Sequence, residues 1–371
     1  MTQKKQHHIE NNPEFKGIKV NRGIETPPMV NPNRLTRKGI AKRKNLSVDE
    51  FVEGILAGNR VILSQAVTLI ESVKPEHHDL AQQIIVKCLP HAGKSVRIGV
   101  TGVPGAGKST FIEALGKQIT SNGGKLAVLA IDPSSERTKG SILGDKTRME
   151  ELANDKNAYI RPSPSAGSLG GVARKTRETV ILCEAAGFDT IFIETVGVGQ
   201  SEIAVHSMVD FFLLIQISGA GDELQGIKRG IMEMADGIVI NKADGNNIER
   251  AELAQAQFRS ALHLFPLSPS GWSPEVLTCS AIFKTGIKET WDMITNYISF
   301  VNNNHYFNDR RTQQAKYWMY ESINQTLNSS FYNHHKIKKQ LKLIEIDVLN
   351  DKMSSFVAAK SLLDIYFEES K

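Results

Sequence analysis

Residues 102–109, which read GVPGAGKS, constrain the possible fold of this chain more than any other segment. They match the pattern G-x-x-x-x-G-K-[ST] of a phosphate-binding loop. The preceding residues 96–100 have the length and branching of a buried strand, and a helix is expected to start near Lys108. In this arrangement backbone N–H groups and the positive end of the helix dipole converge on a phosphate. The sequence therefore predicts a strand, a phosphate-binding loop and a helix in succession.

Two side chains of this loop are predicted to act on the phosphates and on a metal ion. Lys108 is expected to reach the β- and γ-phosphates, and the Ser109 hydroxyl is placed to ligate Mg²⁺. The alternative is a glycine-rich turn that caps an ordinary helix. The predicted phosphate-binding residues are Gly102, Val103, Pro104, Gly105, Ala106, Gly107, Lys108, Ser109 and Thr110.

A second motif indicates which base the nucleotide carries. Residues 237–240 read as a short buried strand that delivers Asn241, Lys242 and Asp244 at its carboxyl end, where ligands bind in open α/β sheets. The two acceptor oxygens of Asp244 fit the N1–H and exocyclic amine of guanine, whereas the N1 acceptor of adenine would repel them. Asn241 is expected to tie this loop to the phosphate loop, and the Lys242 stem to cover the base. By itself such a tetrad is also common at turns and helix starts.

The last strand of the nucleotide-binding domain is expected at residues 275–281. The backbone at its end would support the O6 atom of guanine. The predicted guanine-binding residues are Asn241, Lys242, Asp244, Ser280, Ala281 and Ile282.

Two further predicted strands end in carboxylates. Residues 125–131 precede Asp132, and residues 190–193 precede Glu194. In a parallel sheet both carboxylates would emerge beside the phosphate loop, near the γ-phosphate and its Mg²⁺. Asp132 could instead cap the turn that follows it. Glu194 stands where many GTPases carry an aspartate.

The segment after Glu194 has the character of a nucleotide-sensing switch. The Gly197 N–H is expected to sense the γ-phosphate, which makes residues 198–209 a switch segment. Val198 stands where Ras-like proteins carry their water-positioning glutamine, and Gln200 comes too late for that role. The sequence therefore predicts slow intrinsic hydrolysis, on the order of 10⁻⁴ to 10⁻² s⁻¹.

Several longer runs together resemble one protein family. The runs are DPSS at 132–135, GSILGDKTRM at 140–149, RPSPS at 161–165, ETVGVGQSE at 194–202 and GDELQGIKRG at 221–230. They resemble the GTPase chaperones of methylmalonyl-CoA mutase, a family also labelled ArgK or LAO/AO transport system kinase. The resemblance covers residues 47–300 well and the termini only loosely.

The resemblance implies roles that spacing alone does not assign. It implies a chaperone whose GTP hydrolysis gates loading, protection or reactivation of an adenosylcobalamin-dependent acyl-CoA mutase. The cobalamin is expected on the mutase, and Mg²⁺ is the cofactor expected on this chain. On periodicity alone, residues 224–235 would be an amphipathic helix with a solvated basic face. The implied catalytic residues are Lys108, Asp145 and Glu194, the metal ligands are Ser109, Asp132, Asp145 and Glu194, and the mutase-responsive switch holds Asp222, Glu223, Gln225, Lys228 and Arg229.

Three other functions remain open at this point. A nickel-insertion GTPase would share the fold class, but it requires a Cys- or His-rich metal site that this sequence lacks. A protein kinase is disfavoured because no H-R-D or D-F-G motif is present. A GTP-gated binding module with incidental hydrolysis is distinguished by comparing turnover with and without the mutase.

The composition is that of a cytoplasmic globular protein. Hydrophobic residues make up 40% and charged residues 23% of the chain, and its formal net charge is +5. Residues 1–5 begin no apolar signal segment, and Glu10 and Glu14 disfavour a transit peptide. No apolar run reaches the length of a membrane span, the longest being a predicted buried strand at 211–215. The cysteines, predicted on two helices and one strand, form no ligand or disulfide pattern; they are Cys88, Cys183 and Cys279.

Periodicity divides the chain into four regions. Residues 1–46 are predicted to be a disordered basic arm, and the lack of interleaved aromatics argues against nucleic-acid binding. A capping box at Ser47 opens a helical domain over 47–92. Strands and helices alternate over 93–302, which predicts an α/β P-loop NTPase domain of SIMIBI type, with a mainly parallel sheet and helices on both faces. Residues 303–371 form amphipathic helices that would pair in a homodimer, the alternative being that they fold back on their own nucleotide domain. The helices of this last region are expected at 313–327, 337–349 and 354–367.

Overall fold

The computed structural model describes residues 46–72, 74–132, 149–164, 169–195, 201–219 and 229–368. Apart from Leu46, the predicted N-terminal arm lies outside these residues.

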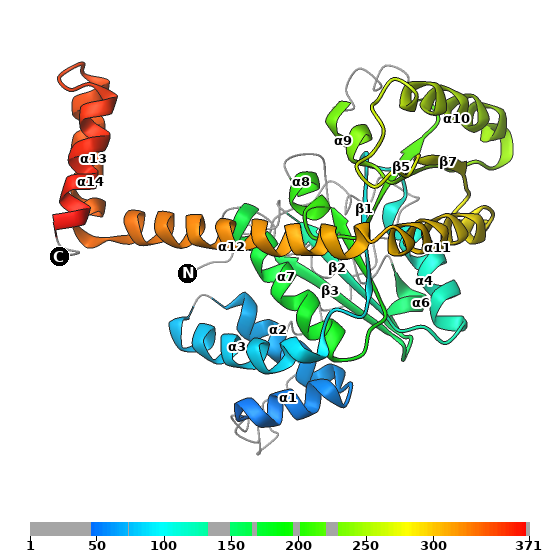
Figure 1. Cartoon of the computed structure of the whole chain (residues 1–371), viewed down its shortest axis with the longest axis horizontal. Coiled ribbons are helices and arrows are strands. Elements are labelled where there is room, and N and C mark those ends of the chain that lie inside the picture. The colour runs from blue at the N-terminus through cyan, green and yellow to red at the C-terminus, as the bar shows by residue number, and fades with distance from the viewer. Residues whose placement is uncertain are drawn as a thin grey trace, which may run out of the picture. The chain divides into compact units, whose positions relative to one another are not determined.

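The centre of the protein is a seven-stranded sheet in the order β3-β2-β4-β1-β5-β6-β7 (Figure 1). Every pairing between neighbouring strands is parallel. This confirms the predicted α/β class, since parallel strands must be joined by crossovers that pass over a face of the sheet. The strands are β1 (Val96–Gly102), β2 (Leu126–Asp132), β3 (Ala158–Pro164), β4 (Thr190–Thr195), β5 (Phe211–Ile217), β6 (Gly237–Asn241) and β7 (Glu275–Thr278).

The last strand is shorter than predicted, because β7 ends at Thr278 rather than at residue 281. Ser280 makes an isolated antiparallel bridge to Thr285 instead, which turns the chain back on itself. The prediction that one cysteine lies on a strand is therefore wrong, because Cys279 follows β7 directly. Cys88 and Cys183 lie on helices as expected, and all three thiols are buried.

Helices cover both faces of the sheet. On β1, Ile98 and Val100 join the core cluster that contains Phe111 of the helix after the phosphate loop. Gly99 points to the other face, where a Cβ atom would lie 2.8 Å from Val205. The helices are α4 (Lys108–Ser121), α6 (Glu150–Ala153), α7 (Leu169–Ala185), α8 (Ser201–His206), α9 (Arg229–Met234), α10 (Ile248–Leu262) and α11 (Ile287–Asn303).

Three helices precede the sheet in the chain. They are α1 (Val48–Leu56), α2 (Arg60–Glu71) and α3 (Pro75–Cys88). The predicted capping box is confirmed: Ser47 Oγ accepts from the Glu50 N–H at 3.2 Å, and the Glu50 carboxylate accepts from the Ser47 N–H at 2.8 Å. These helices pack on one another and on α7, with Ile55, Leu63 and Ile84 fully or almost fully buried.

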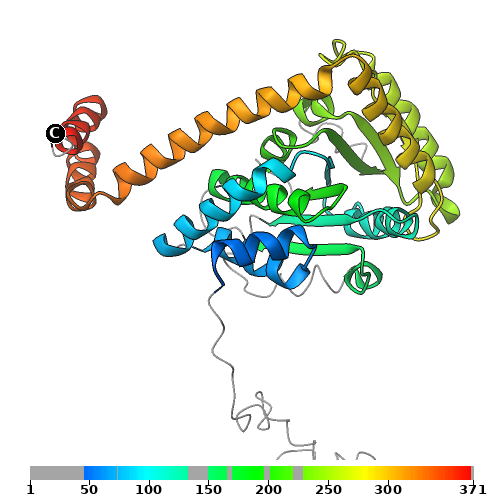
Figure 2. The ribbon, with the colours of Figure 1, turned by 60° about the horizontal axis from the view of Figure 1, so that its bottom comes forward.

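The chain ends in three helices, α12 (Tyr306–Asn333), α13 (His335–Leu349) and α14 (Ser355–Glu368). Figure 2 shows α12 as one long helix that leads from α11 to α13. The predicted helices at 337–349 and 354–367 correspond closely to α13 and α14, whereas 313–327 is only the middle of α12.

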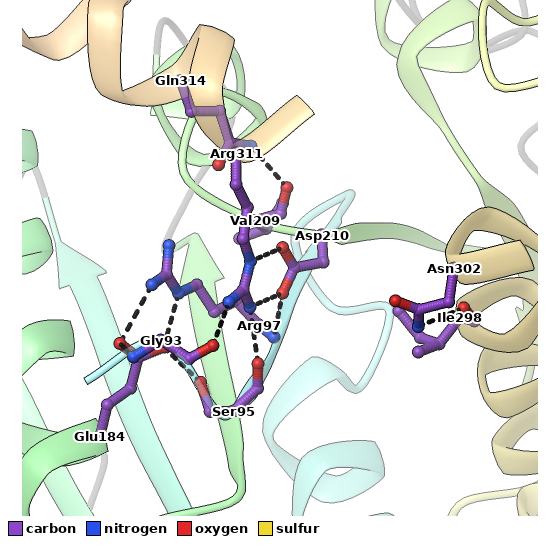
Figure 3. Close-up of polar contacts among 10 residues, drawn as sticks. All are labelled: Gly93, Ser95, Arg97, Glu184, Val209, Asp210, Ile298, Asn302, Arg311 and Gln314. Carbon is purple, nitrogen blue, oxygen red and sulfur yellow. Dashed lines mark hydrogen bonds and ion pairs between the residues drawn. The ribbon is translucent and has the colours of Figure 1, made fainter. Parts of the chain in front are cut away.

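Polar contacts fix the first half of α12 to the nucleotide-binding domain (Figure 3). Arg311 donates to both carboxylate oxygens of Asp210, at 2.8 and 2.6 Å, and to the carbonyls of Gly93 and Ser95, each at 2.6 Å. One turn along the helix, Gln314 Nε2 donates to the Val209 carbonyl at 2.8 Å. One turn further, Trp318 Nε1 donates to the Ser207 carbonyl at 3.1 Å. These contacts hold α12 against the residues that directly precede β1 and β5 and against those that follow α8.

We expect Arg311→Ala to lower the free energy of unfolding by about 3–5 kcal/mol, because the almost fully buried Asp210 carboxylate would lose its cationic partner and keep only the Arg97 N–H. Arg311→Lys keeps the charge without the planar fork and should lose less. Urea unfolding measures both variants. Arg250→Ala, at an exposed position of α10, is the matched control and should stay within about 0.5 kcal/mol of the parent. A loss in Arg311→Ala no larger than that of the control would contradict the anchoring role.

Candidate nucleotide-binding site

The predicted phosphate-binding loop lies at the carboxyl end of β1, between the end of that strand at Gly102 and the start of α4 at Lys108. Gly107, the N-cap of α4, has a φ of 84°, a left-handed conformation that favours glycine. Its missing side chain also makes room for another loop, because a Cβ atom there would lie 2.7 Å from Asn241 Nδ2. The loop therefore has the strand–loop–helix context that the motif predicts.

The Lys108 side chain is buried inside this loop. Its ammonium donates to the carbonyls of Gly102, at 2.9 Å, and Val103, at 3.4 Å. Burial lowers the pKa of Lys108, while the carboxylates of Glu194 and Glu202 oppose that shift. Lys108 is thus a desolvated cation at the centre of the loop, with acidic groups near it.

Glu202 is a residue of this site to which sequence reasoning assigned no role. It lies on α8 and is only 2% exposed, and its charge acts on Lys108. The sequence contains it only as the last letter of the run at 194–202. Its position beside the loop depends on how α8 packs against the sheet, for which no local motif exists.

Ser109 and Glu194 are in direct contact. The Ser109 hydroxyl donates to Glu194 Oε1 at 3.1 Å. The strand order explains this contact, because β4 pairs with β1 and places Glu194 opposite Val100. A hydroxyl and a carboxylate oxygen are ligands that Mg²⁺ prefers, so the donor set of this pair fits that ion.

The side chains of the other two predicted metal ligands, Asp132 and Asp145, are not among those that the structure describes. Asp132 ends β2, which neighbours β4 and not β1, and the placement of its side chain is not described. Asp145 lies outside the described residues, as does the predicted γ-phosphate sensor at Gly197. In the described part of the chain, Ser109 and Glu194 are therefore the predicted ligands whose side chains are placed.

Asn241 joins the predicted guanine loop to the phosphate loop. It ends β6 and is almost fully buried. Its Nδ2 donates to the Ala106 carbonyl at 2.7 Å, and its Oδ1 accepts from the Ala281 N–H at 3.1 Å and from Cys279 Sγ at 3.3 Å. One amide thus fixes three segments that are far apart in the sequence.

Asp244 and Ser280 are also hydrogen-bonded to each other. The Ser280 hydroxyl donates to Asp244 Oδ2 at 2.5 Å, so a carboxylate and the loop after β7 are held together. Lys242 is exposed with a φ of 62°, and Asn247 Nδ2 donates to its carbonyl at 2.7 Å. Ile282 is 72% exposed. Asn247, which supports the loop, is a further residue that the motif did not identify.

The predicted partner-coupling switch falls almost wholly outside the described residues. Arg229 is the first residue of α9, and the placement of its side chain is not described. The remaining members, Asp222, Glu223, Gln225 and Lys228, lie outside the described residues.

A membrane-spanning role has no support in the helices that the structure describes. None of them combines the length and the apolar character needed to cross a bilayer.

Comparisons with known proteins identify the family to which this chain is similar. A family model described as methylmalonyl-CoA mutase-associated GTPase MeaB matches residues 63–336. A probable GTPase of Mycobacterium bovis is 46% identical over 319 residues, which cover 86% of this chain and 95% of the relative. The mouse methylmalonic aciduria type A homolog, described as mitochondrial, is 44% identical over 339 residues, 89% of this chain and 82% of the relative. A crystal structure described as LAO/AO transport system kinase is 37% identical with a TM-score of 0.69, covering 86% of this chain and 97% of that one.

Proposed function

This chain belongs to the family of methylmalonyl-CoA mutase-associated GTPases, and from that premise we propose that its GTP hydrolysis gates an adenosylcobalamin-dependent acyl-CoA mutase. GTPase activity follows from the family itself. The mutase as partner is supported by the family description, which names the association. The gated event would be loading, protection or reactivation of the cobalamin cofactor, which the mutase would carry.

The described residues support a specific division of labour in GTP hydrolysis. Lys108 would donate to the β- and γ-phosphate oxygens in place of the loop carbonyls it contacts at 2.9 and 3.4 Å. Ser109 and Glu194, already 3.1 Å apart, would hold Mg²⁺ together with Asp132 and Asp145. The ion would supply charge neutralisation of the phosphates.

The base would be read at the other end of the site. Asp244 would accept hydrogen bonds from guanine, while the Ala281 backbone would support its O6 atom. The observation that carries this proposal is the bond from Asn241 to Ala106, because it ties the predicted guanine-binding loop to the phosphate loop at 2.7 Å. A ligand with both a triphosphate and a guanine base could then engage both loops at once.

The mutase role is tested by measuring GTP turnover with and without an adenosylcobalamin-dependent acyl-CoA mutase. We expect the mutase to accelerate turnover by about 5- to 150-fold, the range that corresponds to a coupling free energy of about 1–3 kcal/mol. Lys228→Ala should keep basal turnover and lose most of the acceleration. Lys288→Ala, at an exposed position of α11, is the matched control and should respond as the parent does.

Two outcomes would contradict this proposal in different ways. Equal loss of basal and stimulated turnover in Lys228→Ala would place that residue in the hydrolytic site. A mutase that neither binds the parent nor changes its turnover would favour a GTP-gated module with another partner.

The C-terminal helices support a second proposal, a homodimer. Leu343 and Leu349 of α13 and Phe356 of α14 are 58%, 82% and 85% exposed. The two helices are in contact, and large contiguous apolar patches on a protein surface mark sites that a partner covers. A second copy of the same helices could cover it across a two-fold axis.

We expect the double variant Leu349→Glu/Phe356→Glu to be monomeric at micromolar concentration, where the parent is dimeric. Charge placed in an apolar interface must be desolvated, and changes at the central residues of an interface cost about 2 kcal/mol or more. Light scattering gives the mass of each. Lys352→Glu, an exposed position between the two helices, should leave the mass unchanged. A monomeric parent, or a dimeric double variant, would show that these helices are not the contact.

A further inference from the structure

Three buried arginines in or near the first turns of α12 are each paired with a carboxylate. Each has a side chain no more than 15% exposed and an acidic partner within 3.3 Å. The pairs are Arg97 with Glu184, Arg310 with Asp236, and Arg311 with Asp210. Figure 3 shows the first and the last of these pairs. Such pairing is required because an uncompensated charge in a protein interior is strongly destabilising.

Arg177 of α7 breaks this pattern. It is half-buried, yet its side chain makes no hydrogen bond and no ion pair with any described residue, and its Nη1 atom is fully buried without a partner. Its guanidinium carbon lies 5.8 Å from the centre of the Trp318 ring. Burial and the neighbouring Arg97 lower the pKa of Arg177 to about 10, so that it still carries its charge at neutral pH.

No carboxylate of the described residues forms an ion pair with Arg177. Glu184 is the acid that acts on it, but both oxygens of Glu184 are already occupied. Oε1 accepts from Arg97 and from the Ser95 hydroxyl, and Oε2 accepts from Arg97 and from the Gly93 N–H. Arg177 is therefore a retained cation that lacks a counter-ion within the described chain.

An open cavity of 260 Å³ lies beside Arg177, between α3, α7 and α12. We call it the α7–α12 cavity. Arg174 and Arg177 line it, together with the apolar side chains of Ile85, Ile181 and Met319. One acid, Glu178, also lines the cavity, and its Oε1 accepts from Arg174 at 3.1 Å and from Gln82 at 2.9 Å. The cavity thus combines an excess positive charge with apolar walls.

We propose that the α7–α12 cavity binds a small aliphatic carboxylate. The carboxylate would pair with Arg177, assisted by the terminal nitrogens of Arg174, which donate to no described residue. The planar guanidinium fork matches a carboxylate in two parallel hydrogen bonds. The hydrocarbon part would lie against Ile85, Ile181 and Met319. The volume is below the roughly 300–1,000 Å³ of sites for drug-sized ligands, so the ligand is small.

The chemistry of the walls favours a carboxylate over inorganic phosphate. Phosphate offers several charged oxygens and needs donors on many sides, whereas much of the lining of this cavity is apolar, with Ile85, Ile181 and Met319 among its side chains. A short aliphatic acid matches both its charged and its apolar parts. Because Trp318 also lines the cavity and donates to Ser207 after α8, an occupant would contact a residue that holds α12 to the nucleotide-binding domain.

The test is calorimetric titration of the full chain with butyrate and hexanoate, with inorganic phosphate as a separate arm. The protein is saturated with GDP and Mg²⁺ so that the phosphate-binding loop is filled. We expect millimolar or tighter binding of the carboxylates, at least tenfold weaker binding in Arg177→Met and a smaller loss in Arg177→Lys. Arg250→Met is the matched control and should bind as the parent does. GDP affinity should be equal in all four proteins.

A stability measurement separates a ligand role from a structural one. Without carboxylate, Arg177→Met should unfold at the same temperature as the parent or at a higher one, because it removes an uncompensated cation. A lower unfolding temperature would mean that Arg177 stabilises the fold and would overturn the proposal. Met319→Glu, at a half-exposed position on the wall, provides a second variant that should weaken carboxylate binding at least tenfold by repulsion.

Three binding results would also overturn the proposal. They are no carboxylate binding to the parent, binding of phosphate without binding of carboxylates, and carboxylate affinity that is equal in the parent and in Met319→Glu.

Discussion

Asp244→Asn should weaken GTP binding by about 10³- to 10⁴-fold and raise the affinity for xanthosine triphosphate relative to GTP. Asp244 Oδ2 accepts the Ser280 hydroxyl at 2.5 Å, and the carboxylate is held at the end of the loop that follows β6. An amide in its place presents a donor to the N1–H or the amine of guanine, so buried polar groups stay unpaired. Xanthine carries an oxygen where guanine carries the amine, and that oxygen can accept from the new amide.

Competition between the two triphosphates for the same protein measures this change. Ser280→Ala is the matched control, because it removes one hydrogen bond to Asp244 and leaves the carboxylate. We expect about a tenfold loss of GTP affinity there, in line with about 1–2 kcal/mol for one such bond, and no gain for xanthosine triphosphate. Unchanged GTP affinity in Asp244→Asn would mean that another residue reads the base.

The sheet and the phosphate loop could be predicted because their signals are local. The glycine spacing at 102–107, the branched run before it and the Lys-Ser pair after it all lie within 14 residues of chain, from Val96 to Ser109. Short apolar runs such as the one in β5 are bounded by polar residues on both sides, which defines a buried parallel strand. Each of these features needs no information from elsewhere in the chain.

The first turns of α12 could not be predicted from local signals. The amphipathic pattern indicated a helix from 313, yet α12 begins at Tyr306. Its early turns are held by Arg310 and Arg311, which make buried ion pairs with Asp236 and Asp210. A reading based on apolar periodicity treats such arginines as a solvated face, because their partners lie 74 and 101 residues earlier.

The candidate site likewise contains some residues that the sequence predicts and others that it does not. The Asn241 bond to Ala106 was foreseen because the motif gives that asparagine a definite role. The position of Glu202 beside Lys108 could not be predicted, because α8 is short and packing between Val205 and Gly99 sets its register against the sheet. Similarly, the missing counter-ion of Arg177 becomes visible only when Glu184, the acid that acts on it, is seen to be engaged by Arg97.

Gly102→Ala should destabilise the protein more than any other single alanine substitution discussed above, and should abolish nucleotide binding. Gly102 is the last residue of β1 and pairs with Ile215 of β5. A Cβ atom on Gly102 would lie 2.0 Å from the Ile215 carbonyl oxygen and 2.9 Å from its carbon, both of them backbone atoms. Because no side-chain rotation can relieve this clash, β1 and β5 would have to separate where the phosphate loop begins. We expect a loss of more than about 4 kcal/mol in the free energy of unfolding, which is exceptional for one residue.

Gly123→Ala separates this clash from the ordinary cost of giving a glycine a side chain. Gly123 has a φ of 89°, and a Cβ atom there would meet nothing within 4 Å. Its substitution should cost only the left-handed backbone penalty of about 1–2 kcal/mol and leave GTP binding intact. Urea unfolding of both variants, with GTP titration of each, gives the comparison. Equal losses in the two variants would mean that β5 gives way to the new methyl group without cost, and that the close approach of Gly102 to Ile215 is not what fixes the geometry of the phosphate loop.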